Sequence, residues 1–566
     1  MRESLQVKFI SALEKCRAGE SFGEKEEIKK LSLLKNEHVS VQLLINETNA
    51  AAGTRLVSKI KVISGLEGAL SIKNVEQIYV PMAVARGCGD DNYISKEPGA
   101  FPDLLTPLRY DNSAIIPPCE LRCLWFDIKP QGRYNGGVYP LTVELYSPDG
   151  DELYASASVD IEIIDAFLPE TSRFYTQWFY ADCLADYYNV PVWSNRHWEI
   201  IENYIAAAVE GGINMILTPI FTVALDTKVG GERPTAQLVD IEFKDGAYIF
   251  GFDRLDRWIN ILLKYNVKRI EMSHLFTQWG AAHAPKIVAK VNDELQRIFG
   301  WDTDSSSEEY VAFLREFLTA LFRYLEEKGV KDMCVFHISD EPHISHLETY
   351  KKAKAGIADL LKEVTVIDAL SDFEFYKTGA VSVPVPACDR IEPFIEAKVK
   401  PLWTYYCCVQ SRLVPNRFVA MPSARNRIMG VLEYKYDIEG FLQWGFNFYY
   451  NRFSDSLINP FADPCGDYFV PAGDAFSVYP KADGTPLYTV HFLVFKHSRE
   501  DIRAFELLES LSSKEYVMSI INEGVDYDIS FKEYPKDAGY IIALREKVNK
   551  EIKKLIKGNL QLPEKG

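Results

Sequence analysis

The hydrophobic and polar positions follow two different rhythms along the chain, and the change comes near residue 168. From about residue 39 to 164, apolar and polar residues alternate in short runs separated by turn residues such as those of 148–150. Leu141, Val143 and Leu145, for example, fall on one face of an extended strand. Alternation of this kind is typical of strands with one buried face, so we expect an N-terminal β-sandwich over residues 1–168.

After residue 168, short apolar runs alternate with longer segments whose apolar residues recur every three or four positions. This rhythm is typical of parallel βα units. The helical segments include 198–209, 255–265, 309–328 and 347–361. The eight expected strands are 175–180, 214–221, 269–274, 333–338, 364–369, 381–385, 402–407 and 441–449. Eight such units are what a closed (β/α)8 barrel needs.

The predicted fold is therefore multidomain, β plus α/β. We place the barrel at residues 169–515, with its last helix near 499–511 and an inserted loop, rich in Pro, Gly and Asp, at 454–489. A charged helical segment at 538–556 predicts a C-terminal extension over residues 516–566. The chain of 566 residues is also longer than the roughly 250–300 residues that one hydrophobic core serves.

Composition and charge exclude several classes of partner. The 80 acidic residues outnumber the 63 basic ones, and the formal charge of -17 repels phosphate backbones and anionic lipids. No nucleic-acid or membrane partner is expected, and no run approaches the roughly 18 apolar residues of a membrane-spanning helix. The first 20 residues carry charges throughout, which is not the pattern of a secretory signal. The ten cysteines show no repeated spacing, as a disulfide framework or a zinc ribbon would require. A cytoplasmic location is the expectation, and the oligomeric state stays open.

The residues just past each predicted strand are rich in aromatic and polar side chains. In a (β/α)8 barrel this end of the strands forms the site. Rings with polar edges suit sugars, whose C–H faces stack on aromatic faces while their hydroxyls meet Asn, His and carboxylates. Any single ring is more often a packing residue, so only their joint placement favours a carbohydrate substrate. The candidate substrate-binding residues are Trp178, His274, Trp279, His337, Trp403, Tyr405, Tyr406, Trp444 and Asn447.

Asp340 and Glu341, at the end of the fourth strand, are the candidate catalytic residues. Two adjacent carboxyls repel each other, which raises the pKa of one so that it keeps a proton while the other stays charged. The structural alternative is a helix start, in which Ser339 or Asp340 is the cap and Pro342 takes the first turn.

Metal and nucleotide chemistry lack support. His343 and His346 have helical spacing, but no third His or Cys lies nearby to complete a metal site. The sequence contains no GxGxxG after a strand, no GxxxxGK[ST] and no GxSxG. We expect no metal and no cofactor.

A missing carboxylate separates two glycosidase mechanisms. Retaining enzymes on this barrel commonly place a carboxylate nucleophile after the seventh strand, yet residues 397–432 contain no Asp or Glu. The substrate could supply the nucleophile instead, as the oxygen of a 2-acetamido group. Asp340 would then stabilise the oxazolinium-like nitrogen, and Glu341 would protonate the leaving oxygen.

Seven segments of the sequence resemble glycoside hydrolase family 123 and its wider relatives. They are WFYADCLADYY (178–188), GGINMILTPIF (211–221), SHLFTQWGAAHAPK (273–286), FHISDEP (336–342), WTYYCC (403–408), GFLQWGFNFYYN (440–451) and GDAFSVYP (473–480). The resemblance implies a β-sandwich followed by a (β/α)8 barrel and a retaining, substrate-assisted β-N-acetylgalactosaminidase. It assigns the stabilising role to Asp340 and the acid/base role to Glu341.

The predicted function is removal of a terminal β-linked N-acetylhexosamine, with N-acetylgalactosamine as the expected sugar, from an oligosaccharide or glycoconjugate. Two alternatives remain open. The first is a glycosidase for sugars without an acetamido group, which would use a separate carboxylate such as Asp182, Glu271 or Asp368. The second is a carbohydrate-binding protein without turnover, in which the Asp-Glu pair only begins a helix.

Overall fold

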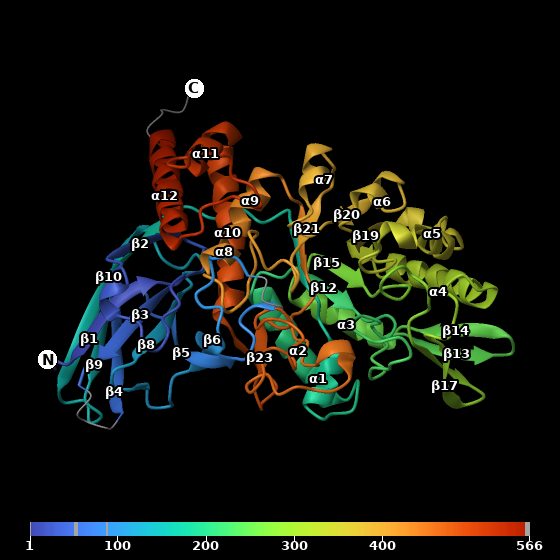
Figure 1. The fold of residues 1–566 in the computed structure, drawn as a ribbon, viewed down its shortest axis with the longest axis horizontal. Helices are drawn as coiled ribbons and strands as arrows, with labels where there is room; N and C mark the ends of the chain where they lie inside the picture. Colours follow the sequence, from blue (N-terminus) through green and yellow to red (C-terminus); the bar gives the residue numbers. More distant parts are fainter. Residues whose placement is uncertain (1, 50–54, 86–88, 561–566) are drawn as a thin grey trace.

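The computed structural model describes residues 2–49, 55–85 and 89–560. Figure 1 shows a β-rich N-terminal region at one end of an elongated molecule and a barrel with its helices at the other. Among the described residues, no helix combines the length and apolar character needed to cross a membrane. The nine described cysteines are all free thiols, and Cys88 lies outside the described residues.

Ten strands fold the N-terminal region into two five-stranded sheets. One sheet has the order β1-β3-β8-β5-β6 and the other β2-β10-β9-β4-β7. The strands are β1 (Leu5–Ser11), β2 (Lys30–Leu34), β3 (Val39–Glu47), β4 (Leu56–Ser64), β5 (Leu70–Val80), β6 (Gly99–Pro107), β7 (Ser113–Ile116), β8 (Leu121–Ile128), β9 (Gly137–Tyr146) and β10 (Leu153–Ile164). The predicted β-rich region is confirmed.

The sheet β1-β3-β8-β5-β6 buries both of its faces. Leu124 and Phe126 of β8 share a core with the predicted inward-facing residues Leu141 and Val143 of the other sheet. Trp125, between them in sequence, points the opposite way into the core of the barrel region. Because successive side chains of a strand point to opposite sides, this alternation joins the N-terminal region to the barrel.

Eight parallel strands form a nearly closed barrel in the order β20-β19-β18-β15-β12-β11-β22-β21. The two ends of this order meet through a short parallel bridge between Ala387 and Tyr405. The strands are β11 (Phe174–Gln177), β12 (Met215–Thr218), β15 (Arg269–Met272), β18 (Cys334–Phe336), β19 (Thr365–Ala369), β20 (Val383–Val385), β21 (Trp403–Tyr405) and β22 (Gly440–Gln443). The predicted eight-strand barrel is confirmed, although each strand is shorter than its predicted run.

At least one helix follows each barrel strand. The helices are α1 (Ala181–Tyr187), α2 (Asn195–Glu210), α3 (Asp253–Lys264), α4 (Glu308–Glu327), α5 (Leu347–Ala355), α6 (Phe373–Lys377), α7 (Glu392–Glu396), α8 (Ala424–Arg427), α9 (Met429–Lys435) and α10 (Val490–Leu511). Ser194, Ser307 and Thr489 accept backbone hydrogen bonds as the N-caps of α2, α4 and α10. The helices after β19 and β20 are only five residues long.

Two element boundaries of the sequence prediction are wrong, and one short hairpin was not predicted. The strand expected at 441–449 ends at Gln443. Beyond it the chain leaves the barrel sheet, and Phe446 and Phe448 pack in the hydrophobic core. The helix expected at 347–361 ends at Ala355, where Gly356 comes so close to α4 that a Cβ would lie 2.6 Å from Val311. The expected loop at 454–489 contains a hairpin, β23 (Val478–Pro480) with β24 (Pro486–Tyr488).

Two further hairpins follow the second and third barrel strands. They are β13 (Asp240–Lys244) with β14 (Ala247–Gly251) and β16 (Ile287–Val291) with β17 (Glu294–Phe299), and together they form one four-stranded sheet. Figure 1 shows this sheet projecting from the side of the barrel that is remote from the N-terminal region.

The C-terminal helices α11 (Lys514–Ile521) and α12 (Ala538–Leu560) return to the N-terminal region. Arg545 of α12 forms ion pairs with Glu37 and with Asp501 of α10, at 2.7 and 2.8 Å. The carboxylate of Glu546 accepts hydrogen bonds from the backbone and side chain of Ser32 in β2. Helix α12 thus connects the N-terminal region to α10, the last helix of the barrel.

Candidate active site

A small pocket of about 140 Å³ lies at the carboxyl ends of the barrel strands. Because parallel strands all end at this edge, their following loops meet around it. Both predicted catalytic residues line the pocket. Its full lining is Trp178, Asp226, Gln278, Trp279, Asp340, Glu341, Ala369, Tyr405, Cys407, Cys408, Val409, Leu442, Trp444 and Phe469.

A wider cavity of about 720 Å³ adjoins the small pocket. We call the two spaces the inner pocket and the outer cavity. Glu341, Tyr405, Cys407 and Val409 line both, whereas Asp340 lines only the inner pocket. Glu341 therefore stands at the boundary between the two spaces, and Asp340 stands inside the smaller one.

The hydroxyl of Tyr405 donates a hydrogen bond of 2.6 Å to Oε1 of Glu341. Burial and the nearby charge of Glu341 raise the pKa of Tyr405 well above its usual value, so the phenol keeps its proton and remains a donor. Glu341 itself has a φ of 45°, which is unusual for a residue with a side chain. Tyr405 holds the carboxyl of Glu341 in one orientation.

The Asp-Glu pair does not begin a helix. The next helical residues are a short turn at Ile344–His346, and α5 starts only at Leu347. A positive φ at Glu341 is also incompatible with the first turn of a helix. The structure therefore contradicts the helix-start alternative.

The backbone before the pair is fixed by Asp368, at the end of β19. Its Oδ1 accepts hydrogen bonds from the backbone N–H groups of Ile338 and Ser339, at 2.9 and 3.2 Å. The carbonyl of Asp340 accepts a further bond of 2.8 Å from the backbone N–H of Trp279. Two neighbouring strands thus determine where Asp340 and Glu341 lie.

Burial raises the pKa of Asp340 well above its usual value, and the charges of Glu341, Asp226 and Asp368 raise it further. Burial also raises the pKa of Asp226 to about 6, with Glu341 adding to the effect and Arg233 opposing it. Three carboxyls that disfavour one another's charge therefore share the inner pocket. The raised pKa belongs to Asp340, to which the sequence analysis gave the stabilising role, and Asp226 is a third member of the cluster.

Sequence reasoning missed Asp226. It lies eight residues beyond the end of β12, whereas the predicted site residues lie within a strand or close to its end. Phe469 was also missed, because it belongs to the inserted loop, far from the barrel strands in sequence. No local motif marks either residue.

Four of the nine predicted substrate-binding residues line the inner pocket: Trp178, Trp279, Tyr405 and Trp444. The other five lie outside its lining. His274 and His337 stack on each other below Trp178, with ring centroids 4.4 Å apart. Trp403 begins β21 at the far end of the barrel and stacks on Phe174. These three are buried packing residues.

Tyr406 and Asn447 also serve the scaffold. The hydroxyl of Tyr406 donates to Oδ1 of Asn426 at 3.1 Å, on the side of β21 away from the pocket. The amide of Asn447 exchanges two hydrogen bonds with the backbone of Tyr180, at 2.9 and 3.0 Å. Both side chains are buried, and neither is placed to contact a ligand in the inner pocket.

The three carboxylates considered as separate nucleophiles are engaged elsewhere. Asp182 forms a buried two-point ion pair with Arg233, at 2.7 and 3.0 Å. Glu271 accepts hydrogen bonds from Thr176 and Trp178 and contacts His337 at 2.7 Å. Asp368 holds the backbone before the Asp-Glu pair. None of the three lines the inner pocket or the outer cavity.

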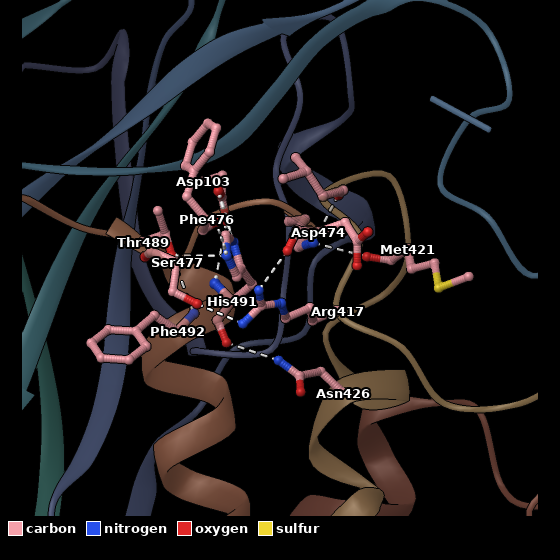
Figure 2. Close-up of polar contacts among 12 residues, drawn as sticks. Asp103, Arg417, Met421, Asn426, Asp474, Phe476, Ser477, Thr489, His491 and Phe492 are labelled. Carbon is pink, nitrogen blue, oxygen red and sulfur yellow. Dashed lines mark hydrogen bonds and ion pairs between the residues drawn. The ribbon is translucent and has the colours of Figure 1, made fainter. Parts of the chain in front are cut away.

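Trp444, on the pocket wall, is held from behind by a buried polar cluster. Its indole N–H donates to Oδ2 of Asp474 at 3.0 Å. Arg417 donates to the carbonyl of Asp474 at 2.7 Å and to the hydroxyl of Ser477 at 2.6 Å. Figure 2 shows Arg417 and Asp474 close to His491 and to Asp103, which comes from the N-terminal region. The N-terminal region thus reaches the layer behind the pocket.

His343 lines the outer cavity, and His346 ends the short helical turn that follows it. Nδ1 of His346 accepts a hydrogen bond of 3.2 Å from the backbone N–H of His343. In the part of the chain that the structure describes, no three or more His, Cys, Asp or Glu side chains are grouped to hold a metal ion.

Two comparisons with known proteins identify the same family. The model of the glycoside hydrolase 123 catalytic domain matches residues 178–508. A family 123 glycoside hydrolase from Clostridium perfringens, studied for glycolipid glycan hydrolysis, superposes with a TM-score of 0.71 over 98% of this chain and 99% of its own, at 13% identity. A family 5 glycoside hydrolase from Bacteroides vulgatus has a TM-score of 0.28, at 13% identity, over 58% of this chain and 66% of its own. No curated protein matches the sequence.

Proposed function

The chain belongs to glycoside hydrolase family 123, and from this premise we propose that it removes a terminal β-linked N-acetylhexosamine, N-acetylgalactosamine above all, with net retention. The substrate would be an oligosaccharide or glycoconjugate. In this proposal the catalytic domain is the barrel at residues 169–515. The two N-terminal sheets form a β-sandwich domain over residues 1–168, and residues 516–566 are a helical extension.

The observation that carries the proposal is the placement of Glu341 at the boundary between two spaces of different size. The inner pocket, of about 140 Å³, suits one terminal sugar, and the outer cavity, of about 720 Å³, suits the larger leaving part. A scissile oxygen between them would lie beside Glu341. The acid that protonates a leaving oxygen must stand at this position.

In the proposed reaction, the acetamido oxygen of the bound sugar attacks its own anomeric carbon while Glu341 gives its proton to the leaving oxygen. The glycosidic bond breaks, and a cyclic oxazolinium-like intermediate forms. Asp340, inside the inner pocket, accepts the N–H of this intermediate and stabilises its positive charge. Glu341, now a carboxylate, takes a proton from water as that water attacks the anomeric carbon. Two inversions give net retention.

The surroundings of the acids favour substrate assistance over a separate protein nucleophile. Asp182, Glu271 and Asp368 are committed to buried partners and lie outside the pocket lining. The end of β21, where retaining enzymes of this fold often carry a nucleophile, contributes Tyr405 instead. Trp178, Trp279, Tyr405 and Trp444 would contact the sugar through their rings.

The test is Glu341→Gln with Asp340 intact, assayed on nitrophenyl β-N-acetylgalactosaminide, β-N-acetylglucosaminide and β-glucoside. We expect the wild type to cleave the acetamido substrates and kcat on an oligosaccharide substrate to fall about 10²- to 10⁴-fold in the variant. Glu348→Gln, which removes an exposed carboxylate of α5 that lines neither space, is the matched control. Full activity of the Glu341 variant would refute the assigned acid.

A thiazoline mimic of the oxazolinium intermediate separates catalysis from simple sugar binding. A substrate-assisted enzyme binds this mimic far more tightly than the free sugar, because it is complementary to the transition state. A carbohydrate-binding protein would show no such preference and no turnover. Wild-type cleavage of the β-glucoside alone would instead favour the glycosidase that uses a separate carboxylate.

A further inference from the structure

Asp226 is a pocket carboxyl to which the proposed mechanism assigns no role. It lies in the loop that joins β12 to β13 and lines the inner pocket together with Asp340 and Glu341. The three acids are close enough for their charges to act on one another, which places the Asp226 side chain beside the space that would hold the sugar.

The backbone of Asp226 is held on both sides. Its N–H donates to Oε1 of Gln278 at 2.8 Å, and its carbonyl accepts from the hydroxyl of Ser454 at 2.9 Å. The φ of Asp226 is 47°, in the left-handed region that residues with side chains seldom adopt. Such a conformation persists only where the surroundings fix it, and it is common at functional sites.

The side chain of Asp226, in contrast, has no protein partner. Across residues 2–49, 55–85 and 89–560, neither of its carboxyl oxygens accepts a hydrogen bond or forms an ion pair. Two arginines attract it. Arg233 is already paired with both oxygens of Asp182, and among the described residues Arg452 forms no ion pair or hydrogen bond with Asp226. A fixed carboxyl without a protein donor, in a small pocket, is available to accept hydrogen bonds from a ligand.

We propose that Asp226 is a specificity-determining residue that accepts a hydrogen bond from a hydroxyl of the bound N-acetylhexosamine, an inference that rests on the proposed function. Glu341 serves the anomeric oxygen and Asp340 the acetamido group, so the hydroxyls left for Asp226 are those on C3, C4 and C6. Hydrogen bonds to a charged acceptor are stronger than neutral ones. A site that binds a hydroxyl this way rejects sugars that lack it.

The test combines Asp226→Asn with nitrophenyl β-N-acetylgalactosaminide and its 3-, 4- and 6-deoxy analogues. Asn tolerates a positive φ, so the variant removes the charge without a new backbone strain. Asp245→Asn is the matched control, because Asp245 has a φ of 52° in an exposed turn between β13 and β14. We expect kcat/KM on the parent substrate to fall roughly 10- to 100-fold in Asp226→Asn and to stay unchanged in the control.

The deoxy analogues test the contact itself. In the wild type, one deoxy substrate should lose a similar factor in kcat/KM. In Asp226→Asn, the same substrate should react about as fast as the parent, because the contact is already lost. If all three deoxy analogues instead lose the same factor in kcat/KM in Asp226→Asn as in the wild type, the role of Asp226 is refuted.

A second variant tests whether Asp226 is instead a nucleophile. Asp226→Ala is assayed with added azide, which would form a C–N bond at the anomeric carbon as the leaving alcohol departs. We expect no glycosyl azide and no rescue, whereas rescue by azide would overturn the proposal. A wild type that cleaves no acetamido substrate would refute the proposed function, and this inference with it. If the wild type is active but the deoxy analogues lose the same factor in kcat/KM with and without Asp226, only the role of Asp226 is refuted.

Discussion

At the scale of single residues, the three carboxyls of the inner pocket determine how activity depends on pH. Burial raises the pKa of Asp340 well above its usual value, and the charges of Glu341 and Asp226 raise it further. If Asp340 must be charged to stabilise the intermediate, kcat/KM rises with pH as Asp340 loses its proton. The acidic limb of the pH profile therefore lies above the usual range of an aspartate.

Asp226→Asn is predicted to move this acidic limb to lower pH. The variant removes one negative charge, so less work is needed to ionise Asp340, and its pKa falls. We expect the acidic limb to move toward the ordinary range of an aspartate, because the charge of Asp226 no longer opposes that of Asp340. Profiles of kcat/KM from pH 4 to 9 measure it, with Asp245→Asn as the control. An unmoved limb would show that Asp340 does not set it.

Tyr405 and Tyr406 offer a matched pair of predictions, because their hydroxyls lie on opposite sides of β21. Tyr405→Phe removes the donor that orients Glu341, and we expect kcat to fall roughly tenfold with little change in stability. Tyr406→Phe removes a buried bond to Asn426, and we expect a loss of about 1 kcal/mol in the free energy of unfolding with kcat unchanged. Steady-state kinetics and urea unfolding of both variants measure the difference. Equal kinetic effects would contradict it.

The same strand shows what the sequence could and could not predict about the site. A run such as Trp403–Tyr406 indicates a strand, but not which of its side chains reach the pocket. Tyr405 does so, Tyr406 points to the other face, and Trp403 lies deeper on the face of Tyr405. Depth in the barrel depends on the register between strands, which one sequence does not contain. Asp340 and Glu341 were predictable because they lie within five residues of the end of β18.

At the scale of elements, the link between β18 and β19 connects stability with the position of the catalytic pair. Asp368→Ala leaves the backbone N–H groups of Ile338 and Ser339 without their acceptor. Because both groups are buried, we expect a loss of about 2–4 kcal/mol in the free energy of unfolding and a fall in kcat/KM. Asp368→Asn keeps an acceptor oxygen, so its free energy of unfolding and its kcat/KM should both fall less than those of Asp368→Ala. Unfolding curves and kinetics at one pH test this, and unchanged kcat/KM in the Ala variant would contradict the link.

The elements themselves were predicted with uneven success. Runs of apolar residues identified all eight barrel strands, because such strands are buried on both faces. The hairpins β13–β14 and β16–β17 were missed, since each is a short, largely exposed strand pair with a weak apolar pattern. The turn residues Asp245 and Gly246 are a local hairpin signal in the first of them. The helices α6 and α7 have five residues each, too few to show a helical period.

At the scale of the whole molecule, the N-terminal region is part of the barrel's support. Trp125 of β8 lies in the same core as the barrel residues. Figure 2 shows Asp103 of β6 pointing at His491, which lies in the first turn of α10. Both oxygens of Asp103 contact Nδ1 of His491, at 3.0 and 2.9 Å, and one also accepts the backbone N–H of His491 at 3.2 Å. Nε2 of His491 is 3.2 Å from the carbonyl of Phe476, next to Ser477 of the cluster behind Trp444.

Asp103→Ala is therefore predicted to weaken the whole molecule rather than the N-terminal region alone. The variant leaves two buried donors of His491 unsatisfied, so we expect a loss of about 2–4 kcal/mol in the free energy of unfolding. Since the two regions share one core, circular dichroism and tryptophan fluorescence should show the same urea transition, shifted to lower urea together. Asp151→Ala, at an exposed position of the same region, should leave both unchanged. Eight of the nine tryptophans lie beyond residue 168, so tryptophan fluorescence reports mainly on the barrel. If the fluorescence transition of Asp103→Ala occurs at the same urea concentration as in the wild type, the stability of the barrel does not depend on this contact.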